Sequence, residues 1–195
     1  MSVGTIPGIA LTGLMALALA MPVESSAEST LISGTKHQSA ARVFVGMVVA
    51  VADGDTVTVL KGHEQIRVRI SGIDAPEKGQ AYGARSKQSL VRLVHGKEVR
   101  VDYKKQDRYG RLVGSIWTPA SKCISSDCPR ELDAGLTQIT LGMAWHYKEY
   151  QQEQPESERE LYANAEIDAR RNRQGLWADQ NPVPPWIVRR ERRTK

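Results

Sequence analysis

Cysteine is scarce in this sequence, with only Cys123 and Cys128 among 195 residues. A structural zinc site needs four ligands at characteristic spacings, and the four histidines do not supply them. We therefore do not expect a zinc-stabilised fold. In an oxidising compartment the two cysteines could close a small disulfide loop worth about 2 kcal/mol, and the sequence leaves open whether they do.

The sequence also lacks a hydrophobic run long enough to span a bilayer. The apolar run over residues 9–21 has 13 residues, whereas a transmembrane helix needs about 20. This run resembles the hydrophobic region of a signal peptide, and Ala18-Leu19-Ala20 supplies a small-x-small cleavage site. We expect residues 1–20 to be a signal peptide and the protein to be exported, to the periplasm or the medium. Because no Lys or Arg precedes the run, a retained membrane anchor is the alternative.

Excess positive charge is scarce outside the C-terminal tail, although the net charge is +5 and the pI is near 9.3. Residues 189–195 hold five basic side chains and one acidic side chain and contribute +4, so residues 1–188 contribute only +1. Overall basicity is therefore weak evidence for nucleic-acid binding. We expect the tail to be a solvated end rather than a docking element.

Length and composition indicate a single folded domain. Hydrophobic residues make up 41% of the chain and charged residues 25%, which is ordinary for a soluble globular protein. A polar segment rich in Ser and Thr precedes the first alternating residues near position 42. We expect a linker over residues 21–40, a domain over 41–178 and a Pro-containing basic extension over 179–195.

Alternating apolar residues and turn signals predict a small barrel. Five segments rich in Val and Ile are expected to be strands: 43–51, 56–60, 65–70, 98–103 and 112–117. Helical spacing of apolar residues, with a glycine after each end, predicts three helices: 82–94, 133–141 and 156–173. Three prolines make residues 181–186 an extended segment. This order fits an α+β fold, a five-stranded OB-type β-barrel with three packed helices.

Three short segments combine carboxylates with arginines, which is what hydrolysis of a phosphodiester requires. Positive charge must stabilise the phosphate while a carboxylate activates water. The segments are Asp53-Gly54-Asp55-Thr56, Arg69-Ile70-Ser71-Gly72-Ile73-Asp74-Ala75-Pro76-Glu77 and Asp107-Arg108-Tyr109-Gly110-Arg111. Asp55 enters a strand from a turn and Asp74 follows the end of another strand, so both can converge at one rim of the barrel. Such oxygen ligands, with a backbone carbonyl next to Asp74, suit Ca²⁺ better than zinc.

Each segment also has an ordinary structural explanation. Asp-Gly is a common turn former, and Asp-x-Pro often caps a helix. Arg67 and Arg69 share one strand face and Arg111 follows a turn, so all three could be solvated strand residues. The segments indicate a site only when they are taken together.

The order and spacing of the three segments resemble the staphylococcal (micrococcal) nuclease family. The similarity extends over residues 42–177 and includes Gly142-Met143-Ala144-Trp145 and Gly175-Leu176-Trp177. The resemblance implies an OB-fold barrel and Ca²⁺-dependent cleavage of DNA and RNA, single-stranded or frayed, that leaves 3′-phosphate ends. We expect a monomer whose partner is its nucleic-acid substrate, with no stable protein partner.

The resemblance also implies roles for individual residues. Asp55 and Asp74 match the family's carboxylate ligands of calcium, and Ala75, in place of the more usual threonine, offers its backbone carbonyl. Glu77 matches the carboxylate that activates the attacking water. The two guanidinium groups that bind the phosphate are matched by Arg69 and Arg111.

Aromatic residues of the family's substrate site are matched less closely. Tyr109 matches a residue that contacts a neighbouring phosphate. Tyr147 and Tyr150, and also Trp145, are candidates for stacking on a base, although an aromatic residue near a helix end often serves packing instead. The stretch after Glu77 is short, so contacts made by the family's longer loop cannot be transferred.

Charge arithmetic supports a bound cation independently of the family. Asp55, Asp74 and Glu77 carry −3 and the two arginines carry +2, so the bare site has a charge of −1 and repels a phosphodiester. One Ca²⁺ changes this to +1. The competing interpretations are a non-catalytic OB module that binds single strands or oligosaccharides, and a surface-anchored binding protein. The complete set of carboxylates and arginines favours the enzyme.

Overall fold

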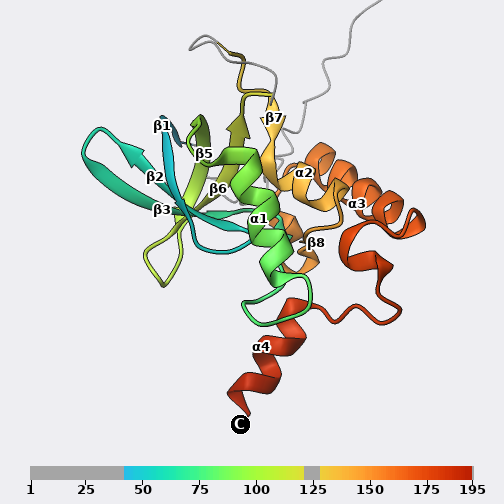
Figure 1. The fold of residues 1–195 in the computed structure, drawn as a ribbon. Coiled ribbons are helices and arrows are strands. Elements are labelled where there is room, and N and C mark those ends of the chain that lie inside the picture. Colours follow the sequence, from blue (N-terminus) through green and yellow to red (C-terminus); the bar gives the residue numbers. More distant parts are fainter. Residues whose placement is uncertain (1–41, 121–127, 195) are drawn as a thin grey trace, which may run out of the picture. The chain divides into compact units, whose positions relative to one another are not determined.

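The computed structural model describes residues 42–120 and 128–194 (Figure 1). The predicted signal segment, the linker and Cys123 therefore lie outside the described residues. Cys128 is buried and disulfide-bonded. Within the described ranges, no helix combines the length and the apolar character that crossing a membrane requires.

Five strands form a closed barrel, as the sequence predicts. They are β1 (Arg42–Val51), β2 (Thr56–Lys61), β3 (Glu64–Ile70), β5 (Glu98–Gln106) and β6 (Leu112–Thr118). Their order in the sheet is β3-β2-β1-β5-β6, with antiparallel neighbours, and a parallel pairing between β3 and β6 closes the barrel. Three two-residue strands were not predicted: β4 (Ile73–Asp74) pairs with β8 (Trp145–His146), and β7 (Leu132–Asp133) extends β6.

Alternation of side chains explains why these segments are strands. Every second residue of a strand points to the same face, so one set fills the barrel and the other faces outward. The inward set is mostly β-branched and fully buried: Val48, Val57, Val59, Val68, Val99, Val101 and Ile116. Branched side chains pack well on a pleated surface, which favours the strand over a helix.

The three predicted helices are confirmed, and they pack on the barrel and on one another. They are α1 (Gly83–Val94), α2 (Ala134–Thr140) and α3 (Glu156–Arg171). Leu90 and Ile139 bring α1 and α2 into the core. Asp133 caps α2 by accepting hydrogen bonds from two of its backbone N–H groups, and its other carboxylate oxygen accepts one at 2.8 Å from the Tyr162 hydroxyl of α3.

The chain also forms short 3₁₀ helices, η1 (Lys148–Glu153) and η2 (Gly175–Ala178), and a fourth α-helix, α4 (Pro185–Arg193). The prediction of an extended segment over residues 181–186 is wrong for its last two residues, which begin α4. A proline lacks an N–H group, but the first turn of a helix leaves that group unbonded in any case. Pro185 therefore starts a helix instead of preventing one.

Two glycines bring the turn after α2 against the turn after α3. Gly142 and Gly175 both have positive φ angles, of 62° and 54°, and their backbones touch. A β-carbon on Gly142 would lie 2.2 Å from the Gln174 carbonyl, and one on Gly175 would lie 2.2 Å from the Gly142 carbonyl. Only glycine fits at both positions. This contact directs the chain after α3 back toward Trp145, against which Trp177 packs with ring centroids 4.3 Å apart.

Candidate active site

Barrel closure brings the predicted site residues to one rim. Thr56 at the start of β2 pairs with Arg69 near the end of β3, and the Asp55 carbonyl accepts a hydrogen bond from the Ile70 N–H at 2.8 Å. On the other side of β3, Arg69 pairs with Val113 of β6. Residues just before β2 and just before β6 therefore lie beside the end of β3. The pairing of β4 with β8 fixes Asp74 close by.

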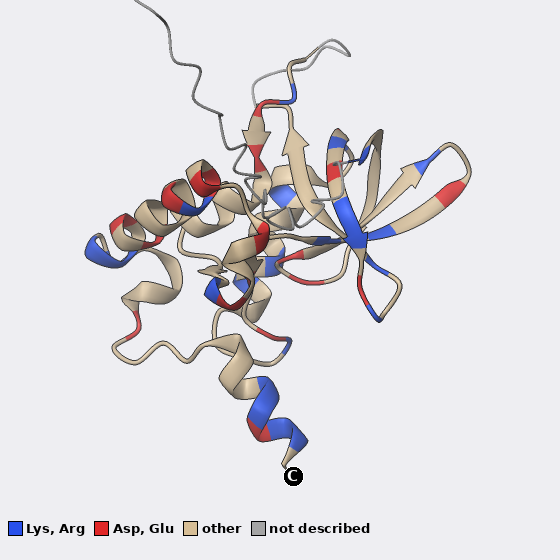
Figure 2. Ribbon diagram, turned by 180° about the vertical axis from the view of Figure 1, so that it is seen from behind, with Lys and Arg blue, Asp and Glu red and all other residues tan. Residues whose placement is uncertain are grey.

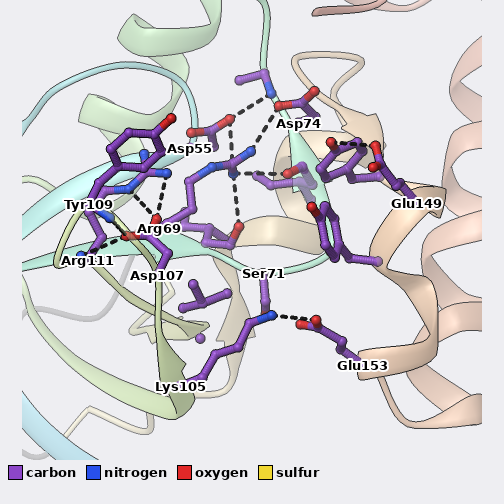
Figure 3. Close-up of a pocket in the computed structure, with 18 of the residues that line it drawn as sticks. Asp55, Arg69, Ser71, Asp74, Lys105, Asp107, Tyr109, Arg111, Glu149 and Glu153 are labelled. Carbon is purple, nitrogen blue, oxygen red and sulfur yellow. Dashed lines mark hydrogen bonds and ion pairs between the residues drawn. The ribbon is translucent and has the colours of Figure 1, made fainter. Parts of the chain in front are cut away.

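Arg69 bridges the two aspartates (Figure 3). Its Nη1 lies 3.0 Å from Asp55 Oδ2 and its Nη2 lies 2.9 Å from Asp74 Oδ1. Nη1 also donates to the backbone carbonyls of Ile70 and Ile73, each at 3.0 Å. One guanidinium thus holds two carboxylates and the turn between β3 and β4. Arg67 on the same strand face is exposed, which fits a solvated residue, whereas Arg69 is mostly buried.

Both aspartates are buried, with exposed fractions of 6% for Asp55 and 0% for Asp74. Loss of water raises the pKa of each carboxyl above its ordinary value, and the nearby guanidinium groups oppose this rise. Asp53, not Asp55, forms the turn before β2, because its Oδ1 accepts the Asp55 N–H at 3.1 Å. The Asp55 carboxylate is therefore free to point into the site, where Oδ2 accepts the Ala75 N–H at 2.8 Å.

Arg111 reaches the same group of residues through a hydroxyl. It forms an ion pair with Asp107 at 2.8 Å, and its Nη1 lies 3.4 Å from the Thr56 hydroxyl, which donates to Asp55 Oδ1 at 3.0 Å. Although partial burial opposes it, hydrogen bonds from Arg111 hold the pKa of Asp107 below its usual value. The contact with Asp107 thereby orients the Arg111 guanidinium toward Asp55.

Glu77 joins the site through a residue that sequence reasoning missed. Arg189 of α4 contacts Glu77 Oε1 at 2.6 Å and both oxygens of Asp74, at 3.1 and 2.7 Å. The expectation that the tail is a solvated end is therefore wrong for Arg189. The tail's excess of arginine was visible in the sequence, but no spacing linked it to residues more than a hundred positions earlier.

The predicted aromatic residues differ in their surroundings. Tyr109 is 61% exposed and lies beside the Arg111 guanidinium. The Tyr147 ring stacks on Trp186 of α4 at 5.7 Å and meets the Tyr150 ring edge-on at 5.2 Å. Trp145 is buried against Trp177 and does not line the pocket that holds the others.

All nine residues predicted for the site line a single pocket of about 1290 Å³. They are Asp55, Arg69, Asp74, Ala75, Glu77, Tyr109, Arg111, Tyr147 and Tyr150. The pocket wall contains nine acidic and nine basic residues, and three of the basic ones belong to α4. The wall is thus neutral only when α4 is counted.

The residues present fit a hard cation held by few protein ligands. Across the described ranges, no group of three or more His, Cys, Asp or Glu side chains is arranged to hold a metal. Asp55 and Asp74, however, both contact the Arg69 guanidinium, and burial makes their ionised forms unfavourable. A divalent cation bound by the two carboxylates would offset the free-energy cost of keeping them ionised. Backbone oxygen and water are ordinary further ligands for such an ion.

Comparison with known proteins agrees with this geometry. Residues 67–179 match the family model described as staphylococcal nuclease homologue. The chain belongs to the staphylococcal nuclease family. It is 41% identical over 155 residues to a protein of Shigella flexneri named micrococcal nuclease, covering 75% of this chain and 81% of the relative.

Two further relatives are similarly close in sequence. Protein ParB of Escherichia coli is 42% identical over 147 residues, which are 75% of this chain and 79% of that protein. An uncharacterized endonuclease of Escherichia coli O157:H7 is 37% identical over 144 residues, covering 74% of this chain and 84% of the relative. Family and barrel therefore agree with the architecture expected from the sequence.

Proposed function

We propose that the protein is an exported, calcium-dependent nuclease that hydrolyses phosphodiester bonds of DNA and RNA, prefers single-stranded or frayed substrate and leaves 3′-phosphate ends. Membership of the staphylococcal nuclease family makes it a phosphodiesterase, and that family generally depends on a metal ion. The observation that carries the proposal is the Arg69 bridge between Asp55 and Asp74, with Glu77 and Arg111 on the same pocket wall.

Asp55, Asp74 and the Ala75 carbonyl would hold the calcium ion. When bound, the ion supplies positive charge beside the scissile phosphate. Arg69 and Arg111 present planar guanidinium groups to the same space, and such groups bind phosphate oxygens in pairs. Both are held in the site by hydrogen bonds to neighbouring residues before substrate arrives, which limits the rearrangement that binding phosphate requires.

Glu77 is the proposed general base. Its carboxylate accepts a proton from the water that attacks phosphorus, and the bond to the 5′ oxygen breaks. The 5′ oxygen takes up a proton from solvent and leaves as a hydroxyl, so the phosphate stays on the 3′ side. Tyr109, exposed beside Arg111, would contact a neighbouring phosphate. Tyr147 and Tyr150, which line the same pocket, would offer ring faces for a base.

Incubation of the purified mature protein with single-stranded DNA and RNA, in Ca²⁺ or in chelator, tests the proposal. We expect cleavage only with Ca²⁺, 3′-phosphate termini, and a large loss of rate in Glu77→Gln. Glu64→Gln, at an exposed position on β3, is the matched control and should retain the wild-type rate. Metal-dependent binding without cleavage would instead identify a non-catalytic single-strand-binding module.

The proposed export has separate support. Cys128 is disulfide-bonded, and disulfides persist mainly in oxidising compartments such as the periplasm and the medium. N-terminal sequencing of the protein recovered from cell fractions tests this part. A new N-terminus near residue 21 in the periplasm or medium is expected, whereas an intact N-terminus in the membrane fraction would identify an anchor.

A further inference from the structure

The C-terminal helix α4 forms one wall of the active-site pocket. Trp186, Arg189, Arg190 and Arg193 all line it. The end of the helix is rich in basic residues, with a single acidic residue among them (Figure 2). The preceding segment is tied to the loop after β4, because the Gln80 amide donates to the Val183 carbonyl at 2.6 Å. The helix is therefore docked on the domain from both its ends, with Arg192 donating to the Lys78 carbonyl at 3.2 Å.

Arg189 is the centre of this contact. It makes three hydrogen bonds of 2.6 to 3.1 Å to Asp74 and Glu77, and it occupies both oxygens of the Asp74 carboxylate. Its side chain is 33% exposed while that of Asp74 is 1% exposed, so the pair is shielded on one side. Hydrogen bonds between ionised groups are the strong ones, particularly when a guanidinium binds a carboxylate through two nitrogens.

A second contact covers the aromatic part of the site. Trp186 stacks on Tyr147, with ring planes 21° apart, and meets Trp145 edge-on at 5.5 Å. One helix thus covers both the carboxylates proposed for the cation and water and the ring proposed for a base. Both contacts compete with a loaded site, because the cation would need the Asp74 oxygens that Arg189 binds and a base would need the ring on which Trp186 stacks.

We propose that α4 is an autoinhibitory cap, in which Arg189 takes the place of the divalent cation on Asp74 and Glu77. This inference rests on the proposed function. Binding of the cation displaces Arg189, because the ion competes with this guanidinium for the Asp74 oxygens and repels its positive charge. Trp186 leaves Tyr147 as the helix undocks. The substrate site therefore opens only in protein that has already bound its metal.

When Arg189 competes with the cation, only uncapped protein can bind it. The apparent affinity for the cation is then the affinity of the uncapped protein multiplied by the fraction of protein that is uncapped. Calorimetric titration of the full-length mature protein with Ca²⁺, without nucleic acid, measures that affinity. We expect Arg189→Gln to bind Ca²⁺ about tenfold or more tightly than wild type. Arg190→Gln is the matched control, because it makes the same charge change one residue along α4. Arg190 is exposed and forms no ion pair in the described part of the chain. This substitution should therefore shift the calcium affinity less than about threefold.

Tryptophan emission reports the position of the helix. In wild type we expect Ca²⁺ to change the emission, and in Arg189→Gln the calcium-free protein should already resemble the loaded wild type. Trp186→Phe should remove most of the calcium-dependent signal. If Arg189→Gln is poorly folded, Arg189→Lys replaces it in the test. Lysine keeps the positive charge but cannot bind a carboxylate through two nitrogens, so we expect this variant to bind Ca²⁺ more tightly than wild type.

Each outcome decides between the cap and another role for Arg189. Equal calcium affinities of wild type and Arg189→Gln, or calcium binding with unchanged emission, would overturn the cap while leaving the proposed function intact. Weaker binding by a folded Arg189→Gln would make Arg189 a residue that positions Glu77, which also overturns it. Absence of Ca²⁺ binding by every protein would contradict the calcium-dependent function itself.

Discussion

Replacing Arg69 by glutamine should cost both stability and activity, and the two losses can be measured separately. Among the ion pairs of the described residues, Asp55 is paired only with Arg69, while Asp74 is paired with Arg69 and Arg189. Arg69→Gln therefore leaves one buried carboxylate, that of Asp55, without a counter-charge. Removing one partner of a buried ion pair typically costs 3–5 kcal/mol, and because Asp55 keeps hydrogen bonds from Ala75 and Thr56 we expect about 3 kcal/mol.

Urea unfolding in chelator measures the stability loss, and cleavage of single-stranded DNA in Ca²⁺ measures the activity loss. Activity should fall about 10²-fold or more, as when a preorganised electrostatic donor is removed. Arg67→Gln is the matched control, since Arg67 lies on the same strand face but is exposed, and it should change stability by less than about 0.5 kcal/mol. Equal effects of the two substitutions would refute the reasoning that Arg69 is the buried centre of the site.

Other substitutions separate catalysis from folding. Arg111→Ala should lower activity about 10²-fold but stability by less than about 1 kcal/mol, because its ion pair with Asp107 is partly exposed; a large loss of stability in urea would contradict this. Asp133→Ala removes the cap of α2 and the acceptor of the buried Tyr162 hydroxyl, so thermal or urea unfolding should reveal a loss of about 2 kcal/mol or more. Burial lowers the pKa of His146 below 6.5, so the unfolded chain binds a proton at His146 first, and this residue contributes a fall in the free energy of unfolding as the pH drops below 6.5. The raised pKa values of Asp55 and Asp74 contribute in the opposite direction, so the test is the difference between proteins. His146→Gln should lose less stability than wild type, or gain more, over this pH range, and an unchanged pH dependence would exclude a contribution from His146.

Much of the barrel could be predicted because its strands carry strong local signals. Runs of Val and Ile with period two end at glycines and turn residues, so the predicted strand ends lie within about three residues of the observed ones. The three helices were found for a similar reason, since apolar spacing and a following glycine marked each one. The strands β4 and β8 have only two residues each, which is too short for a periodic pattern.

The site was predictable only in part. Asp55, Arg69, Asp74, Glu77 and Arg111 stood out because carboxylates and arginines recur at strand ends that the barrel brings together. The partners of each guanidinium were not predictable. Arg69 could be solvated or buried on sequence grounds, and the choice depends on where the turn after β3 places its carbonyls.

The C-terminal helix was missed for two physical reasons. Proline is read as a helix breaker, although Pro185 occupies the one position in a helix that tolerates it. The contact of Arg189 with Asp74 spans 115 positions, so no local pattern announces it.

Dependence of cleavage on a cation held by Asp55 and Asp74 is the central claim. The most direct measurement is the rate of single-stranded DNA cleavage in excess chelator and after Ca²⁺ is added back, for wild type and Asp55→Asn. We expect no cleavage in chelator, full recovery of the wild type with Ca²⁺, and no recovery of Asp55→Asn at the concentration that saturates the wild type. Undiminished cleavage in excess chelator would contradict it.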